Sequence, residues 1–255
     1  MLAVGGARAG TVTADTANPF DGAGVFVDNL GNFPGPWALA DELQAAHFTW
    51  IAFHVHNGVW TQYGTNAQWI SVMRQHGLKV GLWGWEDSNA WLAAQLAAFQ
   101  VRLSGADFYI ADAEYDYELK PHTGNWYRSQ VFAQTFRQWE PSLPAAVTTF
   151  GAAIPPWVVP IDFAAWRDNG FDLLPQAYYN QFPAVDRPDM TVAHALRAKW
   201  PLGRVHPVIG VYRHYPAANY VPLLQAAHTT GYSVFIGDQA TAADYQALSV
   251  LNQPG

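Results

Sequence analysis

Four acidic residues follow a short apolar run and give the sequence its clearest capacity for acid–base chemistry. Asp112, Glu114, Asp116 and Glu118 occupy every second position after the run 108–111. Residues two apart on a β-strand share a face, so Asp112 and Glu114 are predicted to point the same way. Neighbouring carboxylates repel when both are ionised, which raises one pKa and leaves a carboxyl that can donate a proton near neutral pH. Glycoside hydrolysis needs such an acid, so we predict Glu114 as the general acid and expect Asp112 to stabilise charge or orient the substrate.

Polar and aromatic side chains also follow the other apolar runs of the chain. If these runs are parallel strands of a barrel, their ends meet at one face, where barrel enzymes build their sites. We therefore predict one acidic, aromatic-rich pocket for a carbohydrate, in which Asp28 and Asp238 join Asp112 and Glu114 in the catalytic group. The predicted substrate-binding residues are His54, His56, Trp83, Trp85, Glu86, Asp116, Gln176, Tyr178, Tyr212 and Arg213.

The segment 109–114, Tyr-Ile-Ala-Asp-Ala-Glu, resembles the strand-4 Asp-x-Glu motif of family 25 glycoside hydrolases, the muramidases that cut peptidoglycan. Asp28, after Phe-Val, is similar to the acid that this family places at the end of strand 1, and Asp238 to its late acidic residue. The resemblance implies that Glu114 is the acid. It also implies that Asp112, Asp28 or Asp238 assists attack by the substrate's own acetamido group or by water.

A second resemblance is to the chitinase-like barrels of family 18, whose strand-4 signature is Asp-x-x-Asp-x-Asp-x-Glu. Asp107, Asp112 and Glu114 fit this signature, whereas Ile110 stands where one Asp belongs. Tyr178 resembles the tyrosine that orients the substrate in that family. Both families act on N-acetylated sugars, so both resemblances imply an N-acetylated polysaccharide as substrate.

The two histidines after the second apolar run, His54 and His56, are predicted to share one face of a strand. With Asp28 or Glu86 they could bind a metal, since imidazole and carboxylate both suit zinc. They could equally bind the substrate or have a purely structural role, and a spacing of two residues does not separate these alternatives. We expect neither a metal nor a cofactor, and the absence of cysteine excludes thiolate ligands and disulfides.

Aromatic residues are abundant, with 12 Trp among 255 residues. Flat apolar rings could stack on sugar rings or fill the core, and both interpretations stay open for Trp60, Trp83, Trp85, Trp126 and Tyr178. Arg213 is expected to pair with the pocket acids, because unpaired buried charges are costly. Together with His214, it could instead contact an acidic group of the substrate.

The elements that would position these residues repeat along the chain as an apolar run followed by an amphipathic stretch that ends at Gly or Pro. Eight such units at even spacing predict a single (β/α)8 TIM barrel of the α/β class. The predicted strands are 24–29, 50–57, 78–86, 108–114, 145–151, 172–180, 205–213 and 232–238. The predicted helices are 37–47, 66–76, 89–103, 126–140, 162–169, 191–200, 217–230 and 244–251.

The chain length of 255 residues suits one such domain, and we expect residues 1–20 to form an N-terminal arm and residues 21–255 to form the barrel. The formal net charge is -7 and the basic residues are scattered, which argues against nucleic acid and anionic membranes as partners. No apolar run is long enough to span a membrane, and the N-terminus does not resemble a signal peptide. The cellular location stays open, with a virion or a non-classical route out of the cell as alternatives.

Two functions remain as hypotheses from the sequence. The first is a glycosidase that cleaves an N-acetylated polysaccharide, peptidoglycan above all. The second is a non-catalytic barrel that binds glycan or serves as part of a larger assembly such as a phage tail, with other virion proteins as partners. The sequence contains neither a Gly-rich phosphate loop nor a Gly-x-Ser-x-Gly elbow, which argues against phosphate chemistry and that type of serine hydrolase.

Overall fold

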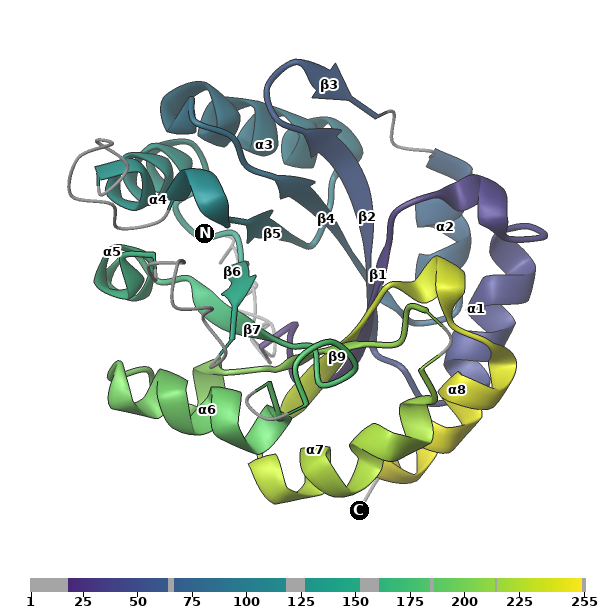
Figure 1. The fold of residues 1–255 in the computed structure, drawn as a ribbon. Coiled ribbons are helices and arrows are strands. Elements are labelled where there is room, and N and C mark those ends of the chain that lie inside the picture. Colours follow the sequence, from purple (N-terminus) through teal and green to yellow (C-terminus); the bar gives the residue numbers. More distant parts are fainter. Residues whose placement is uncertain are drawn as a thin grey trace, which may run out of the picture.

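The computed structural model describes residues 18–63, 67–117, 127–151, 161–183, 186–213 and 215–253. Eight parallel strands form a closed barrel, because β1 pairs with β2 on one side and with β9 on the other (Figure 1). The predicted (β/α)8 fold is thereby confirmed. A short strand, β3 (Thr61–Gln62), extends the end of β2 in an antiparallel ribbon. The barrel strands are β1 (Gly22–Val27), β2 (Trp50–Asn57), β4 (Lys79–Trp85), β5 (Phe108–Asp112), β6 (Ala145–Phe150), β7 (Asp172–Ala177), β8 (Val208–Gly210) and β9 (Gly231–Phe235).

Helices surround the barrel on its outer side (Figure 1). Their ends carry the local signals that the sequence shows. Asn89 caps α3 by accepting a hydrogen bond from the backbone N–H of Leu92, and Gly105 ends this helix in the left-handed conformation, with φ 65°. The α-helices are α1 (Pro36–Ala45), α2 (Ala67–Gln75), α3 (Ala90–Ser104), α4 (Arg128–Trp139), α5 (Phe163–Asp168), α6 (Pro188–Arg197), α7 (Val221–Ala227) and α8 (Ala242–Leu248). Among the described residues, no helix has the length and apolar character needed to cross a membrane.

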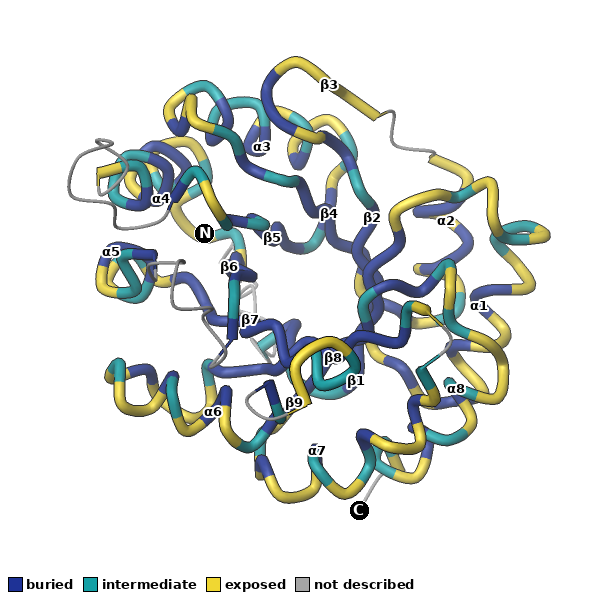
Figure 2. The backbone as a smooth tube through the Cα atoms, viewed as in Figure 1, coloured by how far each residue is buried: buried dark blue, intermediate teal, exposed yellow. Residues whose placement is uncertain are grey.

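Large side chains fill the inside of the barrel. Trp50 and Phe108 are fully buried, and their rings lie against the backbones of Gly24 and Gly81. A Cβ atom at Gly24 would lie 1.8 Å from the Trp50 ring, and one at Gly81 would lie 2.0 Å from the Phe108 ring. Figure 2 shows the strands as the most buried part of the chain. The barrel is therefore a packed core rather than a channel, and a binding site must lie at one of its ends.

The N-terminal end of the barrel is closed by Phe20. Its side chain is 1% exposed and contacts the rings of Trp50 and Phe108, with centroid distances of 6.0 and 5.1 Å. Asn18 fixes the preceding backbone by donating a hydrogen bond to Asp172 at 2.5 Å. The predicted arm lies outside the described residues up to position 17, and Phe20, at its predicted boundary, packs into the barrel core.

Several strands end earlier than the sequence pattern predicts. The segment β5 stops at Asp112 and β7 stops at Ala177, so Glu114 and Tyr178 belong to the loops that follow. A 3-10 turn, Tyr115–Tyr117, follows Glu114 directly. The direction of these side chains is consequently set by loop geometry and not by strand alternation.

Candidate active site

Two acids and one amide form the centre of the site at the C-terminal end of the barrel. Gln176 on β7 donates its Nε2 to Glu114 Oε1 at 2.6 Å and to Asp112 Oδ1 at 3.4 Å. One oxygen of each carboxyl group therefore contacts the same amide nitrogen. The structure thus brings Asp112 and Glu114 together as a close pair.

Asp112 holds the proton of this pair more strongly than an ordinary aspartic acid. Asp112 is half-buried and lines the hollow described below. Burial raises the pKa of Asp112 well above its usual value, and the negative charges of Glu114 and Glu86 raise it further. The sequence placed the proton on Glu114, whereas burial gives a physical reason for a proton on Asp112. The two carboxyls are best regarded as one titrating pair.

A small, mostly apolar hollow lies beside Asp112, and in this structure it is too narrow to hold a water molecule. Tyr178 and Phe235 form one wall with their rings stacked at 5.8 Å, and Trp83 contacts Phe235 at 6.0 Å. Burial and the charges of Asp112 and Glu114 raise the pKa of the Tyr178 hydroxyl well above its usual value, so it remains a hydrogen-bond donor. The lining residues are Phe26, Trp83, Asp112, Thr148, Gln176, Tyr178, Val208 and Phe235.

The indole of Trp83 connects this cavity to the rim of the barrel. The imidazole of His54 stacks on it, and Tyr63, which is 42% exposed, contacts the other side of His54 at 4.8 Å. His54 Nδ1 bonds to the carboxylate of Asp28, and its Nε2 donates to the backbone oxygen of His56 at 2.8 Å. Asp28 and His54 therefore act on the cavity through the position of Trp83.

Asp238 organises the loop that follows β1. It accepts hydrogen bonds from the backbone N–H of Asp28 at 3.3 Å and from the side chain of Asn32 at 3.0 Å. In the part of the chain that the structure describes, no hydrogen bond or ion pair joins Asp28 or Asp238 to Asp112 or Glu114. The four predicted catalytic acids are accordingly divided between a central pair and a rim pair.

His56 and Glu86 do not lie in the mouth of the barrel, and the prediction that His54 and His56 share a face is wrong. The pairing of β2 with β4 shifts by one residue between the two histidines. As a result His56, 1% exposed, packs toward Gln100 of α3 on the outer side of the barrel. Glu86, 0% exposed, lies with it and cannot contact a substrate in the cavity.

The remaining predicted binding residues are placed in three different ways. Tyr212 borders the cavity, because its ring contacts Tyr178 at 5.5 Å, and burial raises its pKa to about 12. Asp116 forms an ion pair with Arg128 at 3.2 Å, which gives it a structural role. Trp85 is half-buried at the end of β4 and makes no ring-to-ring contact with another described residue.

The expected pairing of Arg213 with the pocket acids is not found among the described residues. Arg213 is exposed and has a positive φ of 59°, and its backbone N–H donates to Gln239 at 3.3 Å. Of the predicted stacking residues, Trp60 is 87% exposed in the turn between β2 and β3. Glu118, Trp126 and His214 lie outside the described residues.

Sequence reasoning missed Phe26, Thr148 and Phe235 as cavity residues. Each lies on the inner face of its strand, so strict alternation within the strands carried the necessary signal. Phe235 is the last residue of β9. The prediction extended this strand to Asp238 and therefore chose residues beyond the one that reaches the cavity. Among the described residues, no group of three or more His, Cys, Asp or Glu is suited to hold a metal ion.

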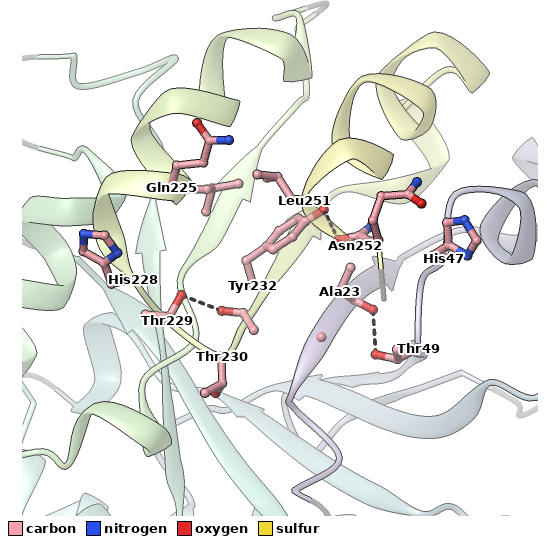
Figure 3. Close-up of a pocket in the computed structure, with 14 residues that line it drawn as sticks. Ala23, His47, Thr49, Gln225, His228, Thr229, Thr230, Tyr232, Leu251 and Asn252 are labelled. Carbon is pink, nitrogen blue, oxygen red and sulfur yellow. Dashed lines mark hydrogen bonds between the residues drawn. The ribbon is translucent and has the colours of Figure 1, made fainter. Parts of the chain in front are cut away.

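A second cavity, of about 380 Å³, lies at the opposite end of the barrel, among the starts of β1 and β9 and the ends of α1 and α7. Figure 3 shows His47 and His228 on its two sides, with Tyr232 and Asn252 between them. Its polar side chains are amides, hydroxyls and imidazoles, and no carboxylate lines it. This cavity cannot supply a pair of acids, so the candidate active site is the one around Asp112 and Glu114.

Comparison with known proteins supports the fold. No protein-family model matches the chain, and no curated protein sequence matches it. A family 18 chitinase from Pseudoalteromonas aurantia superimposes with a TM-score of 0.63 at 14% identity, over 91% of this chain and 100% of that one. The spore cortex-lytic enzyme SleL of Bacillus cereus gives 0.66 at 9% identity, over 91% and 74%.

A variant of the family 18 chitinase from Cycas revoluta in complex with (GlcNAc)4 gives a TM-score of 0.64 at 10% identity, over 90% of this chain and 99% of that one. At such low identity these likenesses establish the barrel fold alone. They support the resemblance to family 18 at the level of the fold, whereas the resemblance to family 25 stays a prediction. They give no support to a virion setting.

Proposed function

We propose that this protein is a glycosidase that hydrolyses an N-acetylated polysaccharide, with the glycan strands of peptidoglycan as the first substrate to test. The observation that carries the proposal is the close pair of Asp112 and Glu114, bridged by Gln176 beside an aromatic cavity. The similar structures support it, since they include chitinases and a spore cortex-lytic enzyme.

Glu114 is the proton donor in this proposal. Its proton passes to the glycosidic oxygen as the bond between that oxygen and the anomeric carbon breaks. Asp112 carries a second proton of its own, because burial and neighbouring charge raise its pKa. Once deprotonated, Glu114 takes a proton from the water that completes hydrolysis, which restores the starting state.

A protonated Asp112 is a hydrogen-bond donor and a poor nucleophile. Attack on the anomeric carbon therefore comes from the acetamido oxygen of the substrate or from water, and Asp112 orients the acetamido group. The hydroxyl of Tyr178 is a second donor beside the same cavity. This division of roles explains why an N-acetylated sugar is the proposed substrate class.

Aromatic side chains would bind the sugar rings. Tyr178 and Phe235 are half-buried beside the polar pair, and Trp83 is buried behind them. Tyr63 and Trp60 are exposed on the β2–β3 ribbon and extend the aromatic surface outward from His54. A chain of several sugars fits this arrangement better than a single sugar.

The test is the release of reducing ends from purified peptidoglycan and from chitin oligosaccharides. The parent protein should release them, and Glu114→Gln should lose the activity while keeping its fold by circular dichroism. Asp168→Asn is the matched control, because Asp168 is an exposed acid on α5 and should leave the rate unchanged. Binding without cleavage by the parent protein would contradict a hydrolase and favour a glycan-binding module.

A further inference from the structure

Three polar side chains are buried behind the candidate active site, on the outer side of the barrel. Glu86 and Tyr109 are 0% exposed and His56 is 1% exposed. Glu86 follows β4, Tyr109 lies on β5 and His56 lies on β2, so three neighbouring strands contribute to the group. None of these side chains lines the cavity that holds Asp112. Burying an acid in this place is costly, and a role is needed to explain it.

The carboxylate of Glu86 is held in a fixed position. The hydroxyl of Tyr109 donates to Glu86 Oε1 at 2.6 Å, and His56 Nε2 lies 3.4 Å from Glu86 Oε2. Gln100 of α3 contacts the other nitrogen of His56 at 3.4 Å. Burial lowers the pKa of His56, but the charge of Glu86 and the hydrogen bonds to Glu86 and Gln100 raise it by more.

Glu86 and Asp112 are neighbours across the β4–β5 pair. The backbone N–H of Glu86 donates to the backbone oxygen of Asp112 at 2.9 Å, and Trp85 is the register partner of Asp112. The carboxyl group of Asp112 lies on the inner side of the sheet, and that of Glu86 lies on the outer side at the same level along the strands. The intervening material is buried protein, in which a charge acts more strongly than it does in water.

The cationic form of His56 opposes part of the negative charge of Glu86. His56 lies on the far side of Glu86 from β5, on β2. Asp116 is paired with Arg128. The further titratable groups around Asp112 and Glu86 are Glu114, Asp87, Tyr117 and Tyr178, all of them acidic groups.

We propose that Glu86 is a positioning residue of the site: its carboxylate, fixed by Tyr109 and His56 on the outer side of the barrel, holds the proton on Asp112 on the inner side. On β5 itself, the inward-facing residue two positions before Asp112 is Ile110, which is apolar and carries no charge. The negative charge that acts on Asp112 in this proposal is that of Glu86, which follows the neighbouring strand β4. The direction of the Asp112 pKa agrees with this, since Glu86 is among the causes of its rise. The role of this proton in catalysis rests on the proposed glycosidase function. The effect of Glu86 on the protonation of Asp112 does not depend on that function.

The test is a pH titration of the protein with ¹³C-labelled aspartate carboxyls, followed by NMR. The Asp112 signal is assigned by its loss in Asp112→Asn. In Glu86→Gln, which keeps the size of the side chain, the midpoint of the Asp112 titration should fall by about one pH unit. If the protein hydrolyses glycan, the alkaline limb of its rate profile should move in the same direction.

A second variant keeps the test independent of the stability of Glu86→Gln. Tyr109→Phe removes the hydrogen bond that fixes the Glu86 carboxylate, so the Asp112 midpoint should fall by a smaller amount. Asp168→Asn, which removes one distant negative charge, should leave the midpoint unchanged. An unchanged midpoint in both Glu86→Gln and Tyr109→Phe would overturn the proposal, as would an equal shift in Asp168→Asn. Absence of hydrolysis by the parent protein would overturn only the glycosidase function, because the titration is read without substrate.

Discussion

The imidazole of His54 lies flat on the indole of Trp83, with ring centroids 3.8 Å apart and planes 5° from parallel. Trp83 also lines the cavity beside Asp112, while His54 bonds to Asp28 at the rim. A residue from β2 thus fixes an aromatic wall that β4 contributes to the site. This relationship links the acids of the rim to the central pair without any direct contact between them.

Removing the imidazole should loosen that wall. His54→Ala is expected to weaken binding of chitin oligosaccharides about 5-fold, because an aromatic pair contributes about 1 kcal/mol beyond its buried area. His54→Phe keeps the stacking and should bind nearly as well as the parent protein. Isothermal titration calorimetry measures both. Equal losses in the two variants would mean that the bond to Asp28, and not the stacking, fixes Trp83.

The bridge from Gln176 should matter for rate more than for binding. Gln176→Leu removes the amide that contacts both Asp112 and Glu114. We expect kcat to fall about 10- to 100-fold, since small misplacements of catalytic groups are costly, while KM changes little. Gln225→Leu, in the cavity at the other end of the barrel, is the matched control and should leave kcat unchanged. A rise in KM with an unchanged kcat would contradict this role.

The raised pKa of Asp112 predicts a pH-dependent stability. The folded protein holds this proton more strongly than the unfolded chain does, so the stability supplied by the protonated form is lost as pH rises through the window between the usual aspartate pKa and the raised one. Asp112→Asn cannot lose a proton. Its free energy of unfolding relative to the parent protein should therefore be higher at about pH 8 than at about pH 4. Urea unfolding at the two pH values measures the difference, and a difference independent of pH would refute the prediction.

The packed barrel interior predicts which glycines are sensitive. Gly24→Ala would place a Cβ 1.8 Å from the Trp50 ring, so we expect a loss of about 1–3 kcal/mol of stability and a lower Tm. Gly203→Ala meets no atom within 4 Å and is the matched control. Calorimetry compares the two. A Tm for Gly24→Ala equal to that of the control would show that the interior can yield.

The sequence by itself determined the barrel. Apolar runs that alternate with amphipathic stretches ending at Gly or Pro are local features, and local features specify strands and helices before any long-range contact forms. The predicted strand 50–57 coincides with β2 (Trp50–Asn57), and the acids at the end of β5 do lie beside a cavity at the C-terminal end of the barrel.

Only the tertiary structure decided where the side chains beyond the strand ends point. Alternation predicts direction only while a strand is regular, and the register shift between His54 and His56 sends these two residues to opposite sides of the sheet. Arg213 lies exposed in a turn with a positive φ, where no ion pair with the pocket acids is found among the described residues. The proton on Asp112 depends on burial and on charges from other strands, Glu86 among them. Such effects arise from segments far apart in the sequence, and no local pattern encodes them.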